Sequence, residues 1–311
     1  MHQKTFMNDF LFFLTSGLCI GAIYALIALG YTLVYGIIKL INFAHGEFYM
    51  VGAYAGFGIY LLLPSALPVF ITFPIIILSS AVAGILIALI TEQVAYKPIR
   101  KSGRLAALLT AIGVSFFLQN MASFINKANP LQYSSDKVGS LGEICQRSVN
   151  VGGSGIKIIQ FAYIPVTIIL TLILWYIIMK TKLGRAMRAV SQDPNAAALM
   201  GINVDAVIRK TFMLGGFMAG IAGTLVGVQS LIEPMMGFMP GLKSFIAAVL
   251  GGIGSIPGAV IGGFLIGVIE NMLVWCGVPT GYKDICAFIV LILVLVVKPQ
   301  GILGKVAREK V

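Results

Sequence analysis

The sequence predicts an all-α polytopic membrane protein, a bundle of about 8–10 transmembrane helices with two interrupted or re-entrant segments. Its 311 residues have a mean hydropathy of +0.98. Only 11% of them are charged, against about a quarter in soluble domains. A helix needs about 20 apolar residues to cross a bilayer. Seven long stretches lack Asp, Glu, Lys and Arg, at 10–38, 48–91, 105–126, 158–179, 211–232, 244–269 and 285–297.

The first spans are predicted at 10–35, 42–63 and 68–91, and the first of these is a retained helix rather than a signal peptide. Four Lys and Arg follow in 97–104, and basic loops mark the cytoplasmic side of a membrane protein. Three spans before that loop place the N-terminus outside. If 36–52 instead folds as a re-entrant hairpin, the N-terminus lies inside, and the sequence leaves both arrangements open.

The next spans, 105–126 and 158–179, enclose a loop at about 127–157 that is rich in Gly, Ser and Asn. We expect this loop on the outer face. The loop at about 180–210 carries six Lys and Arg and is therefore expected in the cytoplasm. The C-terminal tail is also basic.

A parity argument predicts a further helix in the last third of the chain. The chain leaves the cytoplasm after residue 210 and returns to it near 298, so it must cross the membrane an even number of times. Only three spans are evident, at 211–232, 256–275 and 280–298. Residues 237–250 must supply the fourth, and their proline and lysine predict a short or broken helix. Irregular backbone is tolerated at membrane depth only where it is buried in protein or lines a cavity.

Glycines spaced four apart predict close packing between these helices, because small residues let helix backbones approach each other in lipid. The chain has 36 glycines. The pairs are Gly17/Gly21, Gly52/Gly56, Gly216/Gly220, Gly223/Gly227, Gly258/Gly262 and Gly263/Gly267.

Asn42, His45 and Glu47 form the densest polar group inside an apolar region. One interpretation makes them part of a pathway or gate, because ionisable groups within a membrane are costly and usually functional. The other makes them a helix start at the cytoplasmic interface, with Asn42 as N-cap and Glu47 in the first turns. Both interpretations remain open at this point.

Other polar groups are expected near the membrane surfaces. We expect Glu270 and Asn271 at the outer end of their span, although a lumen-facing role for Glu270 is the alternative. Gln119 and Asn120 are likewise expected near the outer surface. Asp284 is expected to reach the interface from the start of the last span.

The sequence contains no recognisable enzyme site. HExxH, GxSxG and paired nucleophile patterns are absent, and the four cysteines show no metal-binding spacing. We therefore predict no catalytic residues, no metal, no cofactor and no nucleic-acid partner. GxxxxGK[ST] is also missing, so any ATP that drives transport must bind to another chain.

The cytoplasmic loop predicts a short helix that begins with Asp193 as N-cap and Pro194 at the first position. Apolar residues recur at Ala197, Met200 and Ile202. A plain connector between helices is usually shorter than this loop, which favours docking on a partner over a simple connection.

Several stretches together resemble the LivH-type permease subunit of bacterial branched-chain amino acid ABC importers, over nearly the whole chain. They are YALIALGYTLVYGIIKLINFAHGEFYMVGAY (24–54), VAYKPIRKS (94–102), LTAIGVSFFLQN (109–120), LMGINVDAVI (199–208), AAVLGGIGSIPGAVIGG (247–263) and YKDICAFIVLILVLVVKPQGILG (282–304). The resemblance implies a single transmembrane permease domain over 1–311, in the bacterial inner membrane. It also implies a second, LivM-like permease subunit, two ATPase subunits and a periplasmic substrate-binding protein that delivers leucine, isoleucine or valine.

The segment NAAALMG (195–201) is similar to the permease coupling motif E-A-A-x-x-x-G of such systems. Ala196, Ala197 and Gly201 match it, while Asn195 replaces the Glu. With Asp193, these residues are the expected ATPase-coupling site.

The resemblance and the two interrupted segments together predict a translocation pathway through the bundle. Its expected residues are Asn42, His45, Glu47, Gly251, Gly252 and Gly254. Two rival functions remain. One is a related permease for urea or short-chain amides, and the other is an ion-coupled secondary transporter, for which only Glu47 and Glu270 could be the buried carboxylates.

Overall fold

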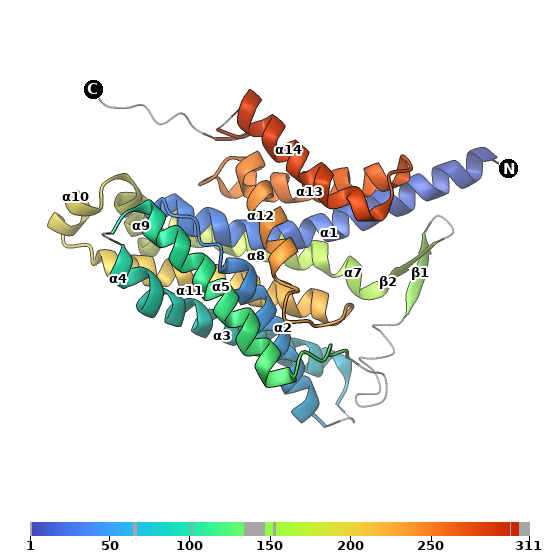
Figure 1. The fold of residues 1–311 in the computed structure, drawn as a ribbon, viewed down its shortest axis with the longest axis horizontal. Coiled ribbons are helices and arrows are strands. Elements are labelled where there is room, and N and C mark those ends of the chain that lie inside the picture. The colour runs from blue at the N-terminus through green and yellow to red at the C-terminus, as the bar shows by residue number, and fades with distance from the viewer. Residues whose placement is uncertain are drawn as a thin grey trace.

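A computed structural model describes residues 2–64, 67–100, 102–133, 147–151, 154–298 and 300–304 as a bundle of helices with one small β-hairpin (Figure 1). The first half contains α1 (His2–Ile38), α2 (His45–Leu62), α3 (Val69–Ile90), the π-helical turn η1 (Thr91–Tyr96), α4 (Lys97–Ile99) and α5 (Arg104–Asn126). The antiparallel strands β1 (Ser148–Val151) and β2 (Ser154–Lys157) follow. The second half contains α7 (Ile158–Phe161), α8 (Tyr163–Lys180), α9 (Lys182–Gln192), α10 (Pro194–Leu199), α11 (Val204–Gly227), α12 (Phe238–Gly251), α13 (Ile256–Trp275), the 3-10 turn η2 (Thr280–Tyr282) and α14 (Lys283–Val297).

The prediction of an all-α polytopic membrane protein is confirmed. Seven helices in the described part of the chain are long and apolar enough to cross a membrane. The 18-residue α2 and the 14-residue α12 bring the number to nine there, within the predicted range. The short α12 is the helix that the parity argument required.

The two ends of the bundle differ in charge. At one end α4, α9 and α10 lie together (Figure 1), and Lys39, Arg100, Pro194 and Val204 line one cavity there. The N-terminus and the β-hairpin lie at the opposite end (Figure 1). Because the basic loops collect at the first end, we take it as cytoplasmic. The N-terminus is then outside.

Parts of two predicted segments lie outside the described residues. They are 134–146 and 152–153 of the outer loop and 305–311 of the basic tail.

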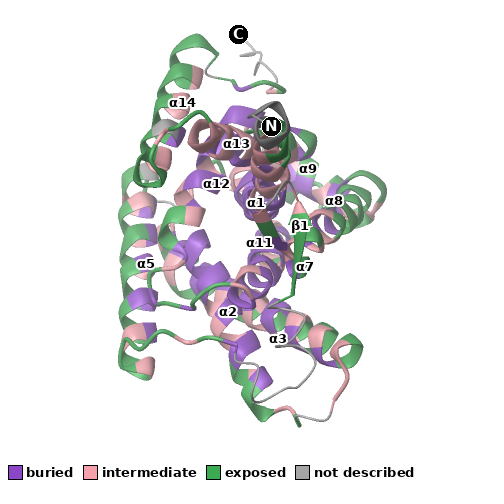
Figure 2. Ribbon diagram, turned by 90° about the vertical axis from the view of Figure 1, so that its right-hand side faces the viewer, coloured by how far each residue is buried: buried purple, intermediate pink, exposed green. Residues whose placement is uncertain are grey.

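The helices are joined through glycine contacts, as the glycine pairs predicted. In the centre of the bundle, Gly21 of α1 packs on Gly267 of α13, and Gly52 of α2 packs on Gly220 of α11. A Cβ atom at any of these glycines would collide with the facing backbone. Figure 2 shows α1 and α11 in this buried centre, while α5 runs along one side and is largely exposed.

Local capping explains where several helices begin. Asn203 accepts a hydrogen bond from the Ala206 N–H at 2.9 Å and so caps α11. Ser255 accepts from the Gly258 N–H at 3.2 Å and caps α13 in the same way. These side chains satisfy backbone donors that the first helical turn leaves free.

Helix α2 begins inside the bundle and not at its surface. After α1 ends at Ile38, residues 39–44 fold back, and His45 packs over Gly30. Gly30 precedes the end of α1 by eight residues, which is about 12 Å of helix at 1.5 Å per residue. The re-entrant hairpin over 36–52 does not form, because α1 continues unbroken to Ile38 and α2 begins at His45, with only the turn at 39–44 between them.

Helix α12 begins beside the start of α2. The chain reaches it from the outer end, where Ile232 pairs with Leu131. Gly237 and Gly241 then pack directly against Gly46. Two interrupted segments, one from each half of the chain, therefore meet inside the protein.

Candidate functional site

Glu47 lies at this meeting point, in the first turn of α2, and is only 1% exposed. Its Oε1 atom accepts hydrogen bonds from Ser115 Oγ at 2.9 Å and from Gln119 Nε2 at 2.7 Å, both on α5. Its Oε2 atom faces Gly237 and has no hydrogen-bond partner within the described ranges. Three helices thus enclose one carboxylate.

Gln119 was expected near the outer surface of the membrane, and its contact with Glu47 was not predicted. The side chain is 5% exposed and holds Glu47, whereas the neighbouring Asn120 is exposed and donates to the Phe116 carbonyl. Ser115 and Gln119 are four residues apart and therefore share one face of α5. That spacing is the sequence signal that could have revealed them.

His45 sits between aromatic rings. Its imidazole lies edge-on to Tyr31 at 4.7 Å and to Phe48 at 5.5 Å between ring centroids. Because the ring also covers Gly30, no other residue could take the place of that glycine without moving it.

Asn42 shapes the turn before α2. Its Oδ1 atom accepts hydrogen bonds from the Ala44 N–H at 3.1 Å and from the Tyr96 hydroxyl at 3.0 Å. The residue at the N-cap position is Ala44, so the prediction of Asn42 as N-cap is wrong by two positions. The predicted interfacial location is also wrong, because Asn42 and Glu47 are both buried where the chain folds back into the bundle.

A cavity of about 410 Å³ adjoins Glu47. Ser115 and Gly237, which contact the two oxygens of Glu47, both line it. The rest of its wall is mainly apolar and comes from α1, α2, α5, α12 and the turn before α2. The apolar residues are Phe43, Leu108, Ile112, Phe116, Phe238 and Leu242.

The glycines of the α12–α13 turn have different surroundings. Gly251 packs on Gly258, and Gly252, with φ +101°, packs on Gly304. Gly254 lines a second cavity, of about 510 Å³, at the cytoplasmic end. The geometry gives the first two a packing role, and their place in a pathway stays a prediction.

The cytoplasmic loop contains the predicted helix, α10. Asp193 accepts hydrogen bonds from the N–H groups of Asn195 (2.8 Å) and Ala196 (3.1 Å), and Pro194 opens the helix. Gly201 ends it with φ +81°, a backbone conformation that favours glycine.

The apolar residues of α10 do not all face the same way. Ala197 is 4% exposed and faces the protein, although the matched coupling motif drew attention to it. Leu199 and Met200 are 89% and 83% exposed at the tip. The outward apolar surface of this loop is therefore that pair.

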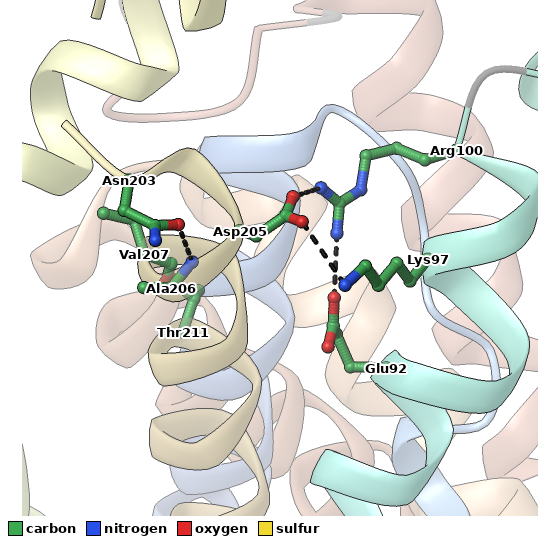
Figure 3. Close-up of polar contacts among 8 residues, drawn as sticks. All are labelled: Glu92, Lys97, Arg100, Asn203, Asp205, Ala206, Val207 and Thr211. Carbon is green, nitrogen blue, oxygen red and sulfur yellow. Dashed lines mark hydrogen bonds and ion pairs between the residues drawn. The ribbon is translucent and has the colours of Figure 1, made fainter. Parts of the chain in front are cut away.

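The cytoplasmic end of the bundle also contains an ion network that the sequence did not predict (Figure 3). Arg100 bridges Glu92 of η1, at 2.8 Å, and Asp205 at the start of α11, at 2.7 Å. Lys97 also approaches Asp205, at 3.5 Å. The network joins the end of the α3 span to α11.

A second network is buried between α1, α12, α13 and α14. Lys243 Nζ lies 2.9 Å from Glu270 and 2.6 Å from Asp284, and the Tyr24 hydroxyl donates to Glu270 at 3.1 Å. Glu270 was expected at the outer end of its span, and the structure shows that its side chain is 2% exposed and paired with Lys243 inside the protein. Asp284 likewise turns inward to the same lysine.

Comparison with known proteins places this architecture in a family. The family model described as branched-chain amino acid transport system / permease component matches residues 13–295. The high-affinity branched-chain amino acid transport system permease protein LivH of Escherichia coli is 45% identical, over 98% of this chain and 99% of the relative. BraD of Pseudomonas aeruginosa is 42% identical, over 96% and 97%. A probable LivH of Methanocaldococcus jannaschii is 29% identical, over 90% and 88%.

Proposed function

The chain belongs to the family of permease components of branched-chain amino acid transport systems, and we propose on that basis how its pathway and its coupling loop work. It is a membrane-spanning permease subunit of an ABC importer for leucine, isoleucine and valine, not an enzyme. It is a multi-pass protein of the bacterial inner membrane. Relatives named for branched-chain amino acids at 42–45% identity favour these substrates over urea or short-chain amides.

We infer that four further components complete the importer. A second, LivM-like permease subunit shares the pathway, two ATPase subunits hydrolyse the ATP, and a periplasmic binding protein delivers the amino acid. The exposed apolar surface of α5 supports a partner within the membrane, because this helix stands at the side of the bundle next to the cavity (Figure 2). The whole of 1–311 serves as one transmembrane permease domain.

The pathway is proposed to run past Asn42, His45 and Glu47, with Gly254 near its cytoplasmic end and Gly251 and Gly252 fixing the turn beside it. Discontinuous membrane helices that meet near mid-depth are typical of substrate sites in transporters. The starts of α2 and α12 form such a pair, and a cavity adjoins them. Its mostly apolar wall suits an amino acid with an aliphatic side chain.

The observation that carries the coupling proposal is the apolar tip at Leu199 and Met200. Asp193 and Gly201 fix the two ends of α10 and so hold this tip out from the protein. Exposed leucine and methionine side chains at a cytoplasmic end lie outside the lipid and fit a groove on a soluble partner. The ATPase subunits are that partner in this proposal.

Co-purification of the tagged permease with its co-expressed partners tests the proposal. Wild-type protein retains the ATPases, whereas Leu199→Glu or Met200→Glu loses them and abolishes ATP-driven leucine uptake. Ala197→Asp and Gly201→Asp are poorer probes, because the first buries a charge and the second strains the end of α10.

Leu231→Glu is the matched control, since Leu231 is an exposed leucine near the outer end of the bundle. Retention of the ATPases by Leu199→Glu contradicts the role of the tip. A wild-type protein that purifies alone and moves leucine without ATP contradicts the importer mechanism altogether.

A further inference from the structure

Glu47 is a buried carboxylate without a counter-charge among the described residues. In the described part of the chain, no Lys, Arg or His side chain forms an ion pair with it. Two neutral donors, on Ser115 and Gln119, hold one of its oxygens, and the other oxygen has no hydrogen-bond partner there. An unpaired buried charge costs several kcal/mol. A cation that arrives from outside the chain would remove this cost.

The lysine of the neighbouring helix α12 cannot be that cation. Lys243 of α12 lies between Glu270 and Asp284, at 2.9 Å and 2.6 Å. Its charge is already shared by two carboxylates. Lys243 is therefore not available to Glu47.

The cavity beside Glu47 has the size and chemistry of an amino-acid site. Its volume of about 410 Å³ falls within the range of small-molecule sites, about 300–1,000 Å³. The residues that contact each Glu47 oxygen, Ser115 and Gly237, form part of its wall. Because Glu47 lies behind these two residues, its access to the cavity requires a small separation of α5 from α2.

The start of α12 provides partial positive charge at the same cavity, opposite in sign to the carboxylate of Glu47. Gly237 and Phe238 begin this 14-residue helix, and no acidic residue lies in its first turn. The N-terminal end of a helix carries partial positive charge and attracts anions. In contrast, Glu47 itself already occupies the first turn of α2.

We propose that Glu47, positioned by Ser115 and Gln119, binds the α-ammonium group of the amino acid during its passage through the permease. The start of α12 faces the α-carboxylate, and Leu108, Ile112 and Phe116 of α5 face the aliphatic side chain. This transit site rests on the proposed function and gives that function its substrate contacts. The permease then takes part in selection, because a ligand without an ammonium group leaves Glu47 unpaired.

Leucine transport by the complete complex in proteoliposomes tests the site. ATP is supplied on the side of the ATPase subunits, and leucine-loaded binding protein is supplied on the opposite side of the membrane. The quantity measured is leucine moved per ATP hydrolysed. Glu47→Gln lowers this ratio about tenfold to hundredfold, as expected for the loss of one charged hydrogen-bonded contact. Gln119→Leu lowers it less, because Ser115 still holds the carboxylate.

Asn120→Leu is the matched control, an amide one position further along α5 that does not contact Glu47. It leaves the ratio unchanged. A wild-type ratio in Glu47→Gln overturns the transit site. Absence of ATP-driven leucine uptake by the wild type would instead overturn the proposed function, so the two failures are distinguishable.

A second measurement uses wild-type protein and does not depend on a variant that folds. Radiolabelled leucine is bound to the complex without binding protein and displaced by 3-methylbutylamine, which lacks the carboxylate, or 4-methylpentanoate, which lacks the ammonium group. The amine competes at least tenfold better than the acid. The assignment of the ammonium group to Glu47 is overturned if the acid competes as well as the amine. It is also overturned if the amine competes as well in Glu47→Gln as in the wild-type protein.

Discussion

Glu270 and Glu47 are two carboxylates buried in the same bundle with opposite surroundings. Glu270 has a lysine at 2.9 Å and a tyrosine hydroxyl at 3.1 Å. Glu47 has two neutral donors and no cation among the described residues. They are 2% and 1% exposed, so burial does not distinguish them.

The difference separates a group that holds helices together from a group that is available to a ligand. The Glu270 pair is completed within the chain and joins α12 to α13. Around Glu47, the lack of a cation coincides with a cavity and with two helix starts. Burial alone does not distinguish the two roles. They are distinguished by whether the described part of the chain supplies a cation to the carboxylate.

The largest expected effect on stability comes from Lys243→Met. It leaves the buried Glu270 and the partly exposed Asp284 without their cation, and breaking the buried pair costs about 3–5 kcal/mol of unfolding free energy. Denaturant titration of the purified protein in detergent measures the loss. The triple variant that adds Glu270→Gln and Asp284→Asn regains most of the lost unfolding free energy. A Lys243→Met variant as stable as the wild type would contradict a structural role for these three residues.

A smaller loss is expected for Arg100→Met. Glu92 is 1% exposed and depends on Arg100, but the Arg100 side chain is 22% exposed and water offsets part of the lost contact. We expect a loss of about 2 kcal/mol, measured in the same titration. Lys97→Met is the matched control, since its pair with Asp205 is exposed and long at 3.5 Å and contributes less than about 1 kcal/mol. Equal losses in the two variants would contradict the buried role of Glu92.

The smallest effect on stability is expected for Glu47→Gln, although its effect on transport is large. No ion pair among the described residues is broken, the new amide oxygen still accepts from Ser115, and the cost of burying an unpaired charge is removed, so no unfolding free energy is lost. A loss as large as that of Lys243→Met would show that Glu47 has a structural cation, and the contrast with Glu270 would disappear.

The sequence predicted the helices better than it predicted the contacts between them. Charge-free stretches and glycine spacing can both be recognised from residues close together in the sequence. The first predicted the membrane-spanning helices correctly, and the second predicted the close helix packing correctly. The parity argument predicted α12 because two cytoplasmic segments must be joined by an even number of membrane crossings, whatever the local sequence. Only the structure brings Ser115 and Gln119 to Glu47, 68 and 72 residues away.

The contacts that the sequence did not predict share one physical origin. Glu270, Asp284 and Gln119 were placed near the membrane surfaces because each lies near the end of an apolar stretch. A polar residue at such a position can reach water, or it can reach a partner on another helix. The second outcome depends on helix tilt and on Lys243, which the local sequence does not connect to these residues.

The length of α12 has a consequence for how the protein is synthesised. With 14 residues, α12 is shorter than the 17 or so that span a bilayer alone, and a lysine near a helix centre opposes membrane insertion by about 2.5–3.5 kcal/mol. We therefore expect the emerging α12 to gain a stable place in lipid when α13 follows it out of the ribosome and brings Glu270 to Lys243. The two helices enter the membrane as one hairpin, so a stop in translation between them would leave the growing chain with α12 outside the bilayer.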